Sequence, residues 1–141
     1  MTQTPRRRAR ELALQALYAV EAGEQAPDEV AENVIAGEDL SEKTREYALT
    51  LFRKTLDSQS ATDEIIARLA RNWEIGRIAM VDRIILRMAV TEMQQMIDVP
   101  VKVVLNEAIE LAKEYSTAQS AAFVNGILDS FVKEQPDLSG A

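Results

Sequence analysis

The sequence predicts an all-α protein that folds as a single bundle of about seven helices. Apolar residues recur at helical spacing along nearly the whole chain, and no segment shows a convincing alternation of apolar and polar residues. Glycine and proline are scarce and fall mostly between the helical segments. With 141 residues, 47% of them hydrophobic and 28% charged, the chain can bury one core and has the composition of an ordinary globular domain.

The first two helices are predicted from residues that typically begin and end helices. Thr4 and Pro5 are an N-cap followed by proline at the first helical position, and Gly23 ends this helix. Pro27 opens a short second helix that Gly37 ends. The apolar residues of the first helix recur at steps of three and one, which predicts a buried stripe of Ala9, Leu12, Ala13, Ala16, Leu17 and Val20.

The next two helices are predicted around a break in the helical pattern. A third helix is expected to begin near Ser41 and to carry Tyr47 among its apolar residues. Residues 58–62 predict a break, because serine, threonine and glutamine interrupt the apolar pattern there. Thr62 is then the expected N-cap of a fourth helix that runs to Leu69.

Three further helices follow. A strong helical pattern covers residues 78–96, and it stops before Pro100 because the residue preceding a proline disfavours helix. The next helix is predicted over 101–115, where the segment nearest to a strand leads directly into strong helix formers. After a turn, the last helix covers about 121–132, and Gly126 within it is expected to let two helices approach closely.

Residues 1–135 are predicted to form one helical domain, since no linker long enough to divide the chain is present. Residues 136–141 are expected to be a flexible tail. No segment approaches the roughly 18 apolar residues of a membrane span, and the N-terminal residues do not resemble a secretory signal. Together with the absence of cysteine, this predicts a cytoplasmic protein that does not enter a membrane.

The residue types argue against an enzyme, a metal site and a cofactor. The chain has no cysteine and no histidine, which removes thiolate chemistry, the commonest zinc ligand and the commonest general base. Neighbouring carboxylates such as Glu107 and Glu110 are expected on solvated helix faces, and no glycine-rich phosphate loop or nucleophile elbow is present.

Trp73, the sole tryptophan, is expected to pack in the core or at a helix junction.

Basic residues are concentrated at the N-terminus. The net charge is −7, but residues 1–10 carry Arg6, Arg7, Arg8 and Arg10 and no acid, which leaves 12 basic and 23 acidic residues, or −11, for the remainder. Four cations at the positive end of a helix dipole are mildly unfavourable, by about a few tenths of a kcal/mol each. A bound phosphate reverses the sign of this effect, because helix N-termini and guanidinium groups both recognise phosphate.

The same helix predicts an exposed arc beside the apolar stripe. At about 100° per residue, Arg7, Arg10, Leu14 and Tyr18 share one side of the helix, which we expect to face solvent. Cations beside an exposed aromatic ring suit single-stranded RNA, whose phosphates need charge and whose unstacked bases need a flat surface. From the residues alone, an arginine cluster that only aids solubility is an equally good interpretation.

Four segments resemble the NusB family of transcription antitermination factors. They follow the family's order and spacing and span nearly the whole chain. The segments are Arg6–Tyr18, Asp82–Ala89 with Glu92, Val99-Pro100 with Asn106–Lys113, and Phe123–Asp129.

The resemblance implies a fold of two packed helical subdomains and a function in transcription antitermination. A member of the family is expected to bind the boxA element of nascent RNA together with NusE, a small ribosomal protein. That pair is expected to join the transcribing RNA polymerase complex and to suppress premature termination, notably in ribosomal RNA operons. The sequence leaves open whether the free protein is a monomer or a homodimer.

The resemblance also assigns site residues. The expected RNA contacts are the arginine cluster of Arg6, Arg7, Arg8 and Arg10 on the first helix, with Gln119, Ser120, Phe123 and Asn125 near the last. Tyr18 and Asp82 are expected to meet NusE or the joint protein–RNA surface. The chain departs from some relatives at Ala121-Ala122, where they carry polar or basic residues, and this shifts the expected RNA affinity toward the arginines. Core packing for Phe123 and a helix–helix hydrogen bond for Asn125 are the alternative interpretation.

Two other functions fit a small helical protein with a basic end. A similar helical domain precedes the catalytic domain in some ribosomal RNA cytosine methyltransferases, but no cofactor-binding domain and no cysteine are present here. A helical adaptor that binds only protein is the other alternative, and it predicts no RNA-dependent signal.

Overall fold

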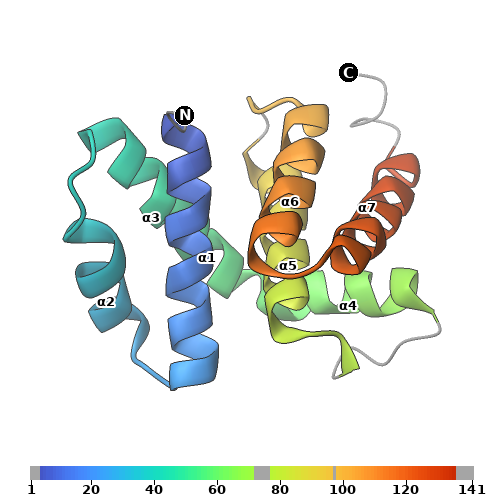
Figure 1. The fold of residues 1–141 in the computed structure, drawn as a ribbon, viewed down its shortest axis with the longest axis horizontal. Helices are drawn as coiled ribbons and strands as arrows, with labels where there is room; N and C mark the ends of the chain where they lie inside the picture. Colours follow the sequence, from blue (N-terminus) through green and yellow to red (C-terminus); the bar gives the residue numbers. More distant parts are fainter. Residues whose placement is uncertain (1–3, 72–76, 97, 136–141) are drawn as a thin grey trace. The chain divides into compact units, whose positions relative to one another are not determined.

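The computed structural model describes residues 4–71, 77–96 and 98–135, and every regular element within these ranges is helical (Figure 1). The all-α prediction is confirmed. The elements in chain order are α1 (Pro5–Gly23), α2 (Pro27–Val30), the π-helix η1 (Ala31–Ala36), α3 (Glu42–Asp57), α4 (Gln59–Ala70), α5 (Met80–Gln95), α6 (Val101–Tyr115) and α7 (Ala118–Lys133).

The chain divides into two compact helical units, residues 1–56 and residues 57–141. The resemblance implied two helical subdomains, and each unit has its own core. The predicted domain boundary at residue 135 and the flexible tail stay predictions, because residues 136–141 lie outside the described ranges. Trp73 also lies outside them.

The first unit is built around α1, against which α2 and η1 pack. The Thr4 hydroxyl caps α1 by accepting a hydrogen bond of 3.2 Å from the backbone N–H of Arg7, and Pro5 occupies the first helical position. At the other end, Glu24 takes a left-handed conformation (φ 52°) directly after Gly23. The second helical segment runs from Pro27 through the π-helix and ends at Gly37, as predicted. The fully buried apolar residues of this unit include Leu12, Val30, Ile35, Ala48, Leu51 and Phe52.

The second unit is organised around α5, which packs against α4, α6 and α7. Every residue from Ile84 to Met93 is buried, so this helix is covered on all sides. A bidentate ion pair connects α5 to α4. The Arg87 Nε–H donates to Asp63 Oδ1 at 2.7 Å, and Arg87 Nη2 donates to Asp63 Oδ2 at 3.0 Å. A second pair, Arg68 to Glu134 at 2.5 Å, joins α4 to the residue that follows α7.

Two predicted helix starts are wrong by about three residues. The expected break at 58–62 shrinks to Ser58, because α4 already begins at Gln59. Thr62 is buried inside the helix, where its hydroxyl donates to the Gln59 carbonyl oxygen at 3.1 Å and does not act as a cap. Likewise α7 begins at Ala118, because the Thr117 hydroxyl caps it by accepting a hydrogen bond of 3.0 Å from the Ser120 N–H.

Two expectations about burial are also wrong. The arc of α1 that was expected to face solvent is only partly exposed, since Arg10 and Leu14 are both 3% exposed while Tyr18 is 46% exposed. Gly126 does not mark a close approach of two helices, because a Cβ added to it meets no atom within 4 Å. Its side of α7 is open, so the glycine is not required there by packing.

Candidate nucleic-acid interface

The N-terminal arginines of α1 are arranged around one aromatic ring from another helix. The guanidinium carbon of Arg6 lies 4.4 Å from the centroid of the Tyr47 ring on α3, and that of Arg10 lies 5.9 Å from the same centroid. Both distances are within the range of a cation–π interaction. Arg6 is exposed and Arg10 is buried, so the Tyr47 ring contacts one cation at the protein surface and one in the interior.

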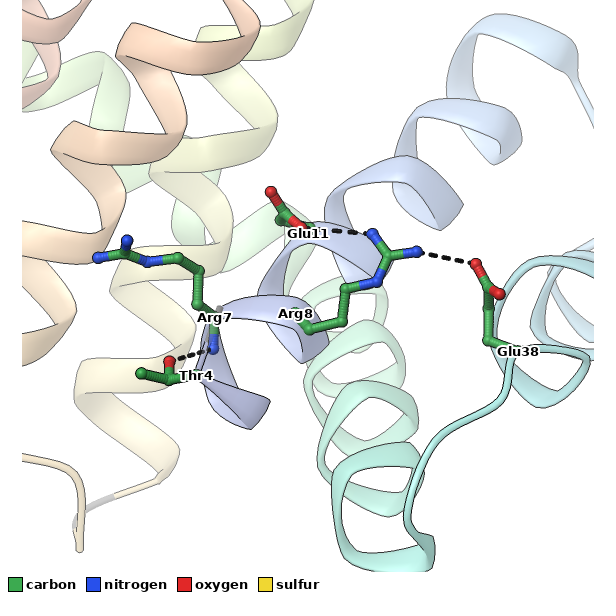
Figure 2. A network of polar contacts seen from close by, with 5 residues as sticks. All are labelled: Thr4, Arg7, Arg8, Glu11 and Glu38. Carbon is green, nitrogen blue, oxygen red and sulfur yellow. Dashed lines mark hydrogen bonds and ion pairs between the residues drawn. The ribbon is translucent and has the colours of Figure 1, made fainter. Parts of the chain in front are cut away.

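Arg8 lies between two carboxylates of its own unit (Figure 2). Its Nη1 donates to Glu11 Oε1 at 3.3 Å, and its Nη2 donates to Glu38 Oε1 at 2.9 Å. The side chain of Glu11 is 3% exposed, whereas those of Arg8 and Glu38 are 34% and 43% exposed. The buried pair positions the guanidinium group, and the outer pair is accessible to water and to a competing anion.

The side chains of Arg7 and Arg8 point in different directions. The guanidinium group of Arg7 extends to the opposite side of α1 from that of Arg8, while the Arg7 backbone N–H is bound to Thr4 (Figure 2). The first turn of α1 contains no acidic residue. The surface at the start of α1 therefore combines the positive end of a helix dipole with Arg6, Arg7 and Arg8, and the partly exposed Glu38 is paired with Arg8 there.

A second cluster lies in the other unit, where the starts of α5 and α7 enclose a cavity of about 260 Å³. Asp82 in the first turn of α5 is 5% exposed, and its Oδ1 has no hydrogen-bond partner. Phe123 is half-buried at the cavity, and the Ser120 hydroxyl is bonded to those of Ser116 and Thr117 at 2.9 and 3.1 Å. The side chains that line the cavity include Arg77, Asp82, Thr117, Gln119, Ser120 and Phe123.

Comparison with known protein families assigns the chain to a family. The model of the NusB family matches residues 7–133, which is most of the chain. The chain belongs to the NusB family.

Individual NusB proteins support this. The chain is 44% identical over 133 residues to the transcription antitermination protein NusB of Salinibacter ruber, covering 94% of this chain and 83% of that one. It is 42% identical over 130 residues to NusB of Chloroherpeton thalassium, a longer protein of which it covers 62%. NusB proteins are antitermination factors and not enzymes, so family membership places this chain among regulators.

Solved NusB structures share the fold. NusB of T. maritima matches with a TM-score of 0.86 and 36% identity, covering 94% of both chains. A crystal structure of antitermination factors NusB and NusE in complex with dsRNA matches with a TM-score of 0.84 and 25% identity, covering 94% of this chain and 99% of that one.

The NusB-type site residues fall into two groups. The four arginines and Tyr18 lie in the first unit, and Asp82, Gln119, Ser120 and Phe123 line one cavity in the second. Asn125 is exposed on α7. The structure thus groups Asp82, which the resemblance linked to the partner, with the residues that it linked to RNA.

Several residues of these two clusters were missed by the sequence analysis. Tyr47 was counted only among the apolar residues of its helix, and Glu38 was not singled out at all. Arg77 and Thr117 line the cavity but match no motif that marks a binding site. A threonine just before a helix is a recognisable capping signal, so Thr117 is the one that local sequence could have revealed.

Two further features are absent from the described part of the chain. It contains no group of three or more carboxylates placed to hold a metal ion. Among the helices between residues 4 and 135, excepting 72–76 and 97, none is long and apolar enough to cross a bilayer.

Proposed function

We propose that this protein is an RNA-binding transcription antitermination factor of the cytoplasm. In this proposal it binds boxA-type single-stranded RNA together with NusE and acts on transcribing RNA polymerase, notably in ribosomal RNA operons. The observation that carries it is the capped, acid-free start of α1 with its arginine cluster. A NusB of similar fold has been crystallised with NusE and dsRNA, which supports the choice of RNA and of this partner.

The phosphate contacts are assigned to the accessible arginines. Arg6, Arg7 and Arg8 are exposed or half-buried, whereas Arg10 is 3% exposed and lies 5.9 Å from the centroid of the Tyr47 ring. We propose that Arg10 mainly positions the Tyr47 ring, against which the Arg6 guanidinium group packs. The other proposed RNA contacts are the cavity residues Gln119, Ser120 and Phe123 together with the exposed Asn125.

The acidic remainder of the chain supports a basic protein partner. Outside the first ten residues the net charge is −11, which favours association with a basic ribosomal protein such as NusE and disfavours long stretches of bare RNA. Tyr18, a large and 46% exposed side chain, is the proposed centre of the partner surface in the first unit, with Asp82 contributing in the second. Homodimerisation through the same surface is a competing state, and it would be recognised by solution mass.

Binding measurements with and without the partner test this function. A boxA-like single-stranded RNA is titrated with the protein at 50 and 200 mM salt, in the presence and absence of NusE. The proposal expects binding that weakens with salt, because phosphate contacts release counterions, and that tightens when NusE is present. RNA binding that is absent under all four conditions would reject it in favour of an adaptor that binds only protein.

Removing the outer carboxylate beside Arg8 should strengthen RNA binding. Glu38 occupies the position that a phosphate needs, so Glu38→Gln is expected to raise the affinity for the RNA about two- to fivefold at low salt. Exposed ion pairs contribute little, so the stability of the fold should change by less than about 1 kcal/mol. The measurement is the same titration at 50 mM salt.

The matched control for Glu38→Gln is Glu42→Gln, which removes the same charge from the exposed first turn of α3. If both variants raise the affinity equally, the effect is that of net charge alone, and Glu38 does not compete for Arg8.

A further inference from the structure

The loop between η1 and α3 is held by the guanidinium group of Arg45, a residue near the start of α3. The Arg45 Nη2 donates to the carbonyl oxygen of Glu38 at 2.9 Å and to that of Leu40 at 3.3 Å. The Arg45 Nε is buried and has no hydrogen-bond partner. Nη2 is therefore committed to the backbone of the loop, and Nε is out of reach of a phosphate outside.

Both backbone polar groups of Glu38 are held as a result. Its carbonyl oxygen accepts from Arg45, and its N–H donates to the carbonyl oxygen of Ile35 at 3.2 Å. After the loop, the Ser41 hydroxyl caps α3 by accepting a hydrogen bond of 3.2 Å from the Thr44 N–H. The backbone from which the Glu38 side chain extends is thus fixed on both sides.

This fixed backbone favours the ion pair of 2.9 Å between Glu38 and Arg8 (Figure 2). An exposed ion pair usually contributes little, partly because two long side chains lose conformational freedom when they form it. Here Arg8 is already held by Glu11, and the backbone of Glu38 is held by Arg45. Less freedom remains to be lost, so Arg8 is paired for a larger fraction of the time.

We propose that Arg45 is a positioning residue that suppresses RNA binding, because it holds the loop of residues 38–40 where the Glu38 carboxylate occupies Arg8. The inference rests on the proposed function, in which Arg8 contacts a phosphate. The first unit then contains its own inhibitor. A phosphate reaches Arg8 only by displacing a carboxylate whose backbone Arg45 keeps in place.

Two arginines of the same unit then act on RNA binding in opposite directions. Removing a cation from a protein surface ordinarily weakens RNA binding, because fewer counterions are released from the phosphates. Removing Arg45 is expected to do the reverse, since the loop is freed and Glu38 can leave Arg8. The sign of the effect separates positioning from overall charge. A loosened fold does not produce it either, because partial unfolding weakens binding.

Titration of boxA-like single-stranded RNA at 50 mM salt tests this with Arg45→Met, which keeps the aliphatic part of the side chain and removes every donor. The affinity should rise about two- to threefold, within the rise expected for Glu38→Gln. Arg45→Lys retains the charge and a donor, and it should bind RNA nearly as the parent does. The control Arg53→Met removes an arginine of α3 whose partner Asp28 is exposed, and it should leave the affinity unchanged or lower it.

The double variant Arg45→Met with Glu38→Gln shows whether Arg45 acts through Glu38. Both changes release the same guanidinium group, so the double variant should bind RNA no more tightly than Glu38→Gln alone. Two gains that multiply would overturn the inference, as would an affinity of Arg45→Met at or below that of the parent. RNA binding that is absent for the parent and all variants contradicts the proposed function instead.

A second pair of variants loosens the loop and leaves Arg45 in place, and it decides the matter if the thermal midpoint of Arg45→Met is too low for titration. Asp39 is an exposed residue of the loop. Asp39→Gly and Asp39→Ala remove the same charge, but glycine leaves the backbone freer. Asp39→Gly should bind RNA about twofold more tightly than Asp39→Ala, and equal affinities would count against the inference.

Discussion

Replacing Arg6, Arg7 and Arg8 together by glutamine should lower the affinity for boxA-like RNA by on the order of 100-fold at 50 mM salt. These side chains supply the accessible cations at the start of α1, and each is assigned one phosphate. For single strands the logarithm of the affinity falls with the logarithm of salt concentration by about 0.7 for each phosphate neutralised. Between 50 and 200 mM salt the parent should therefore lose roughly 20-fold more affinity than the triple variant.

A triple variant of α3 provides the matched control. Lys43→Gln, Arg53→Gln and Lys54→Gln remove three positive charges from α3 of the same unit, outside the arginine cluster. If this control loses as much affinity and salt dependence as the arginine variant, RNA binding depends on total charge and not on the helix tip. The thermal midpoint of both variants is measured alongside, because Arg8 pairs with the buried Glu11 and Arg6 lies over the Tyr47 ring, so the affinities are compared only for folded protein.

The second large effect is expected on stability, at the ion pair that fastens α4 to α5. Arg87→Met should lower the free energy of unfolding of the protein by about 2 kcal/mol or more. Arg87 is 7% exposed and holds both carboxylate oxygens of Asp63, so its loss leaves a mostly buried negative charge without its partner. Urea unfolding followed by circular dichroism measures the change.

Two companion variants separate this pair from its surroundings. Arg68→Met breaks an ion pair of the same helix whose partners are 54% and 39% exposed, and it should cost less than about 1 kcal/mol. Arg87→Met combined with Asp63→Leu removes both charges and should regain part of the lost stability. Equal losses for Arg87→Met and Arg68→Met would show that burial of the Arg87 pair contributes nothing.

The helices were predictable because their signals are local. Thr4, Pro5 and Gly37 mark helix ends by their own backbone preferences, and the range 101–115 was predicted to the residue from its periodicity and the preceding proline. The start of α4 was missed because serine, glutamine and threonine have only weak preferences of their own. There the burial of Thr62 decides that the chain is helical, and burial is a tertiary property.

The candidate sites were predictable only in part. Charge counting located the arginines, and the resemblance located Asp82, Gln119, Ser120 and Phe123. Neither could show that Arg10 is buried against Tyr47 or that Arg8 already holds Glu38, because both contacts join residues from different helices. Periodicity assigns a residue to a side of its own helix, and it does not reveal which other helix covers that side.

The ion pairs at Asp63 and Arg68 fasten α4 near its beginning and near its end, each to a different helical neighbour. A short helix usually frays from its ends, so its amide protons exchange with solvent sooner than those of the core. The buried pair with Arg87 restrains the first half of α4 strongly, whereas the exposed pair with Glu134 restrains the second half only weakly. Deuterium should therefore enter the amides of the first half at nearly the slow rate seen for α5, and those of the last turn sooner.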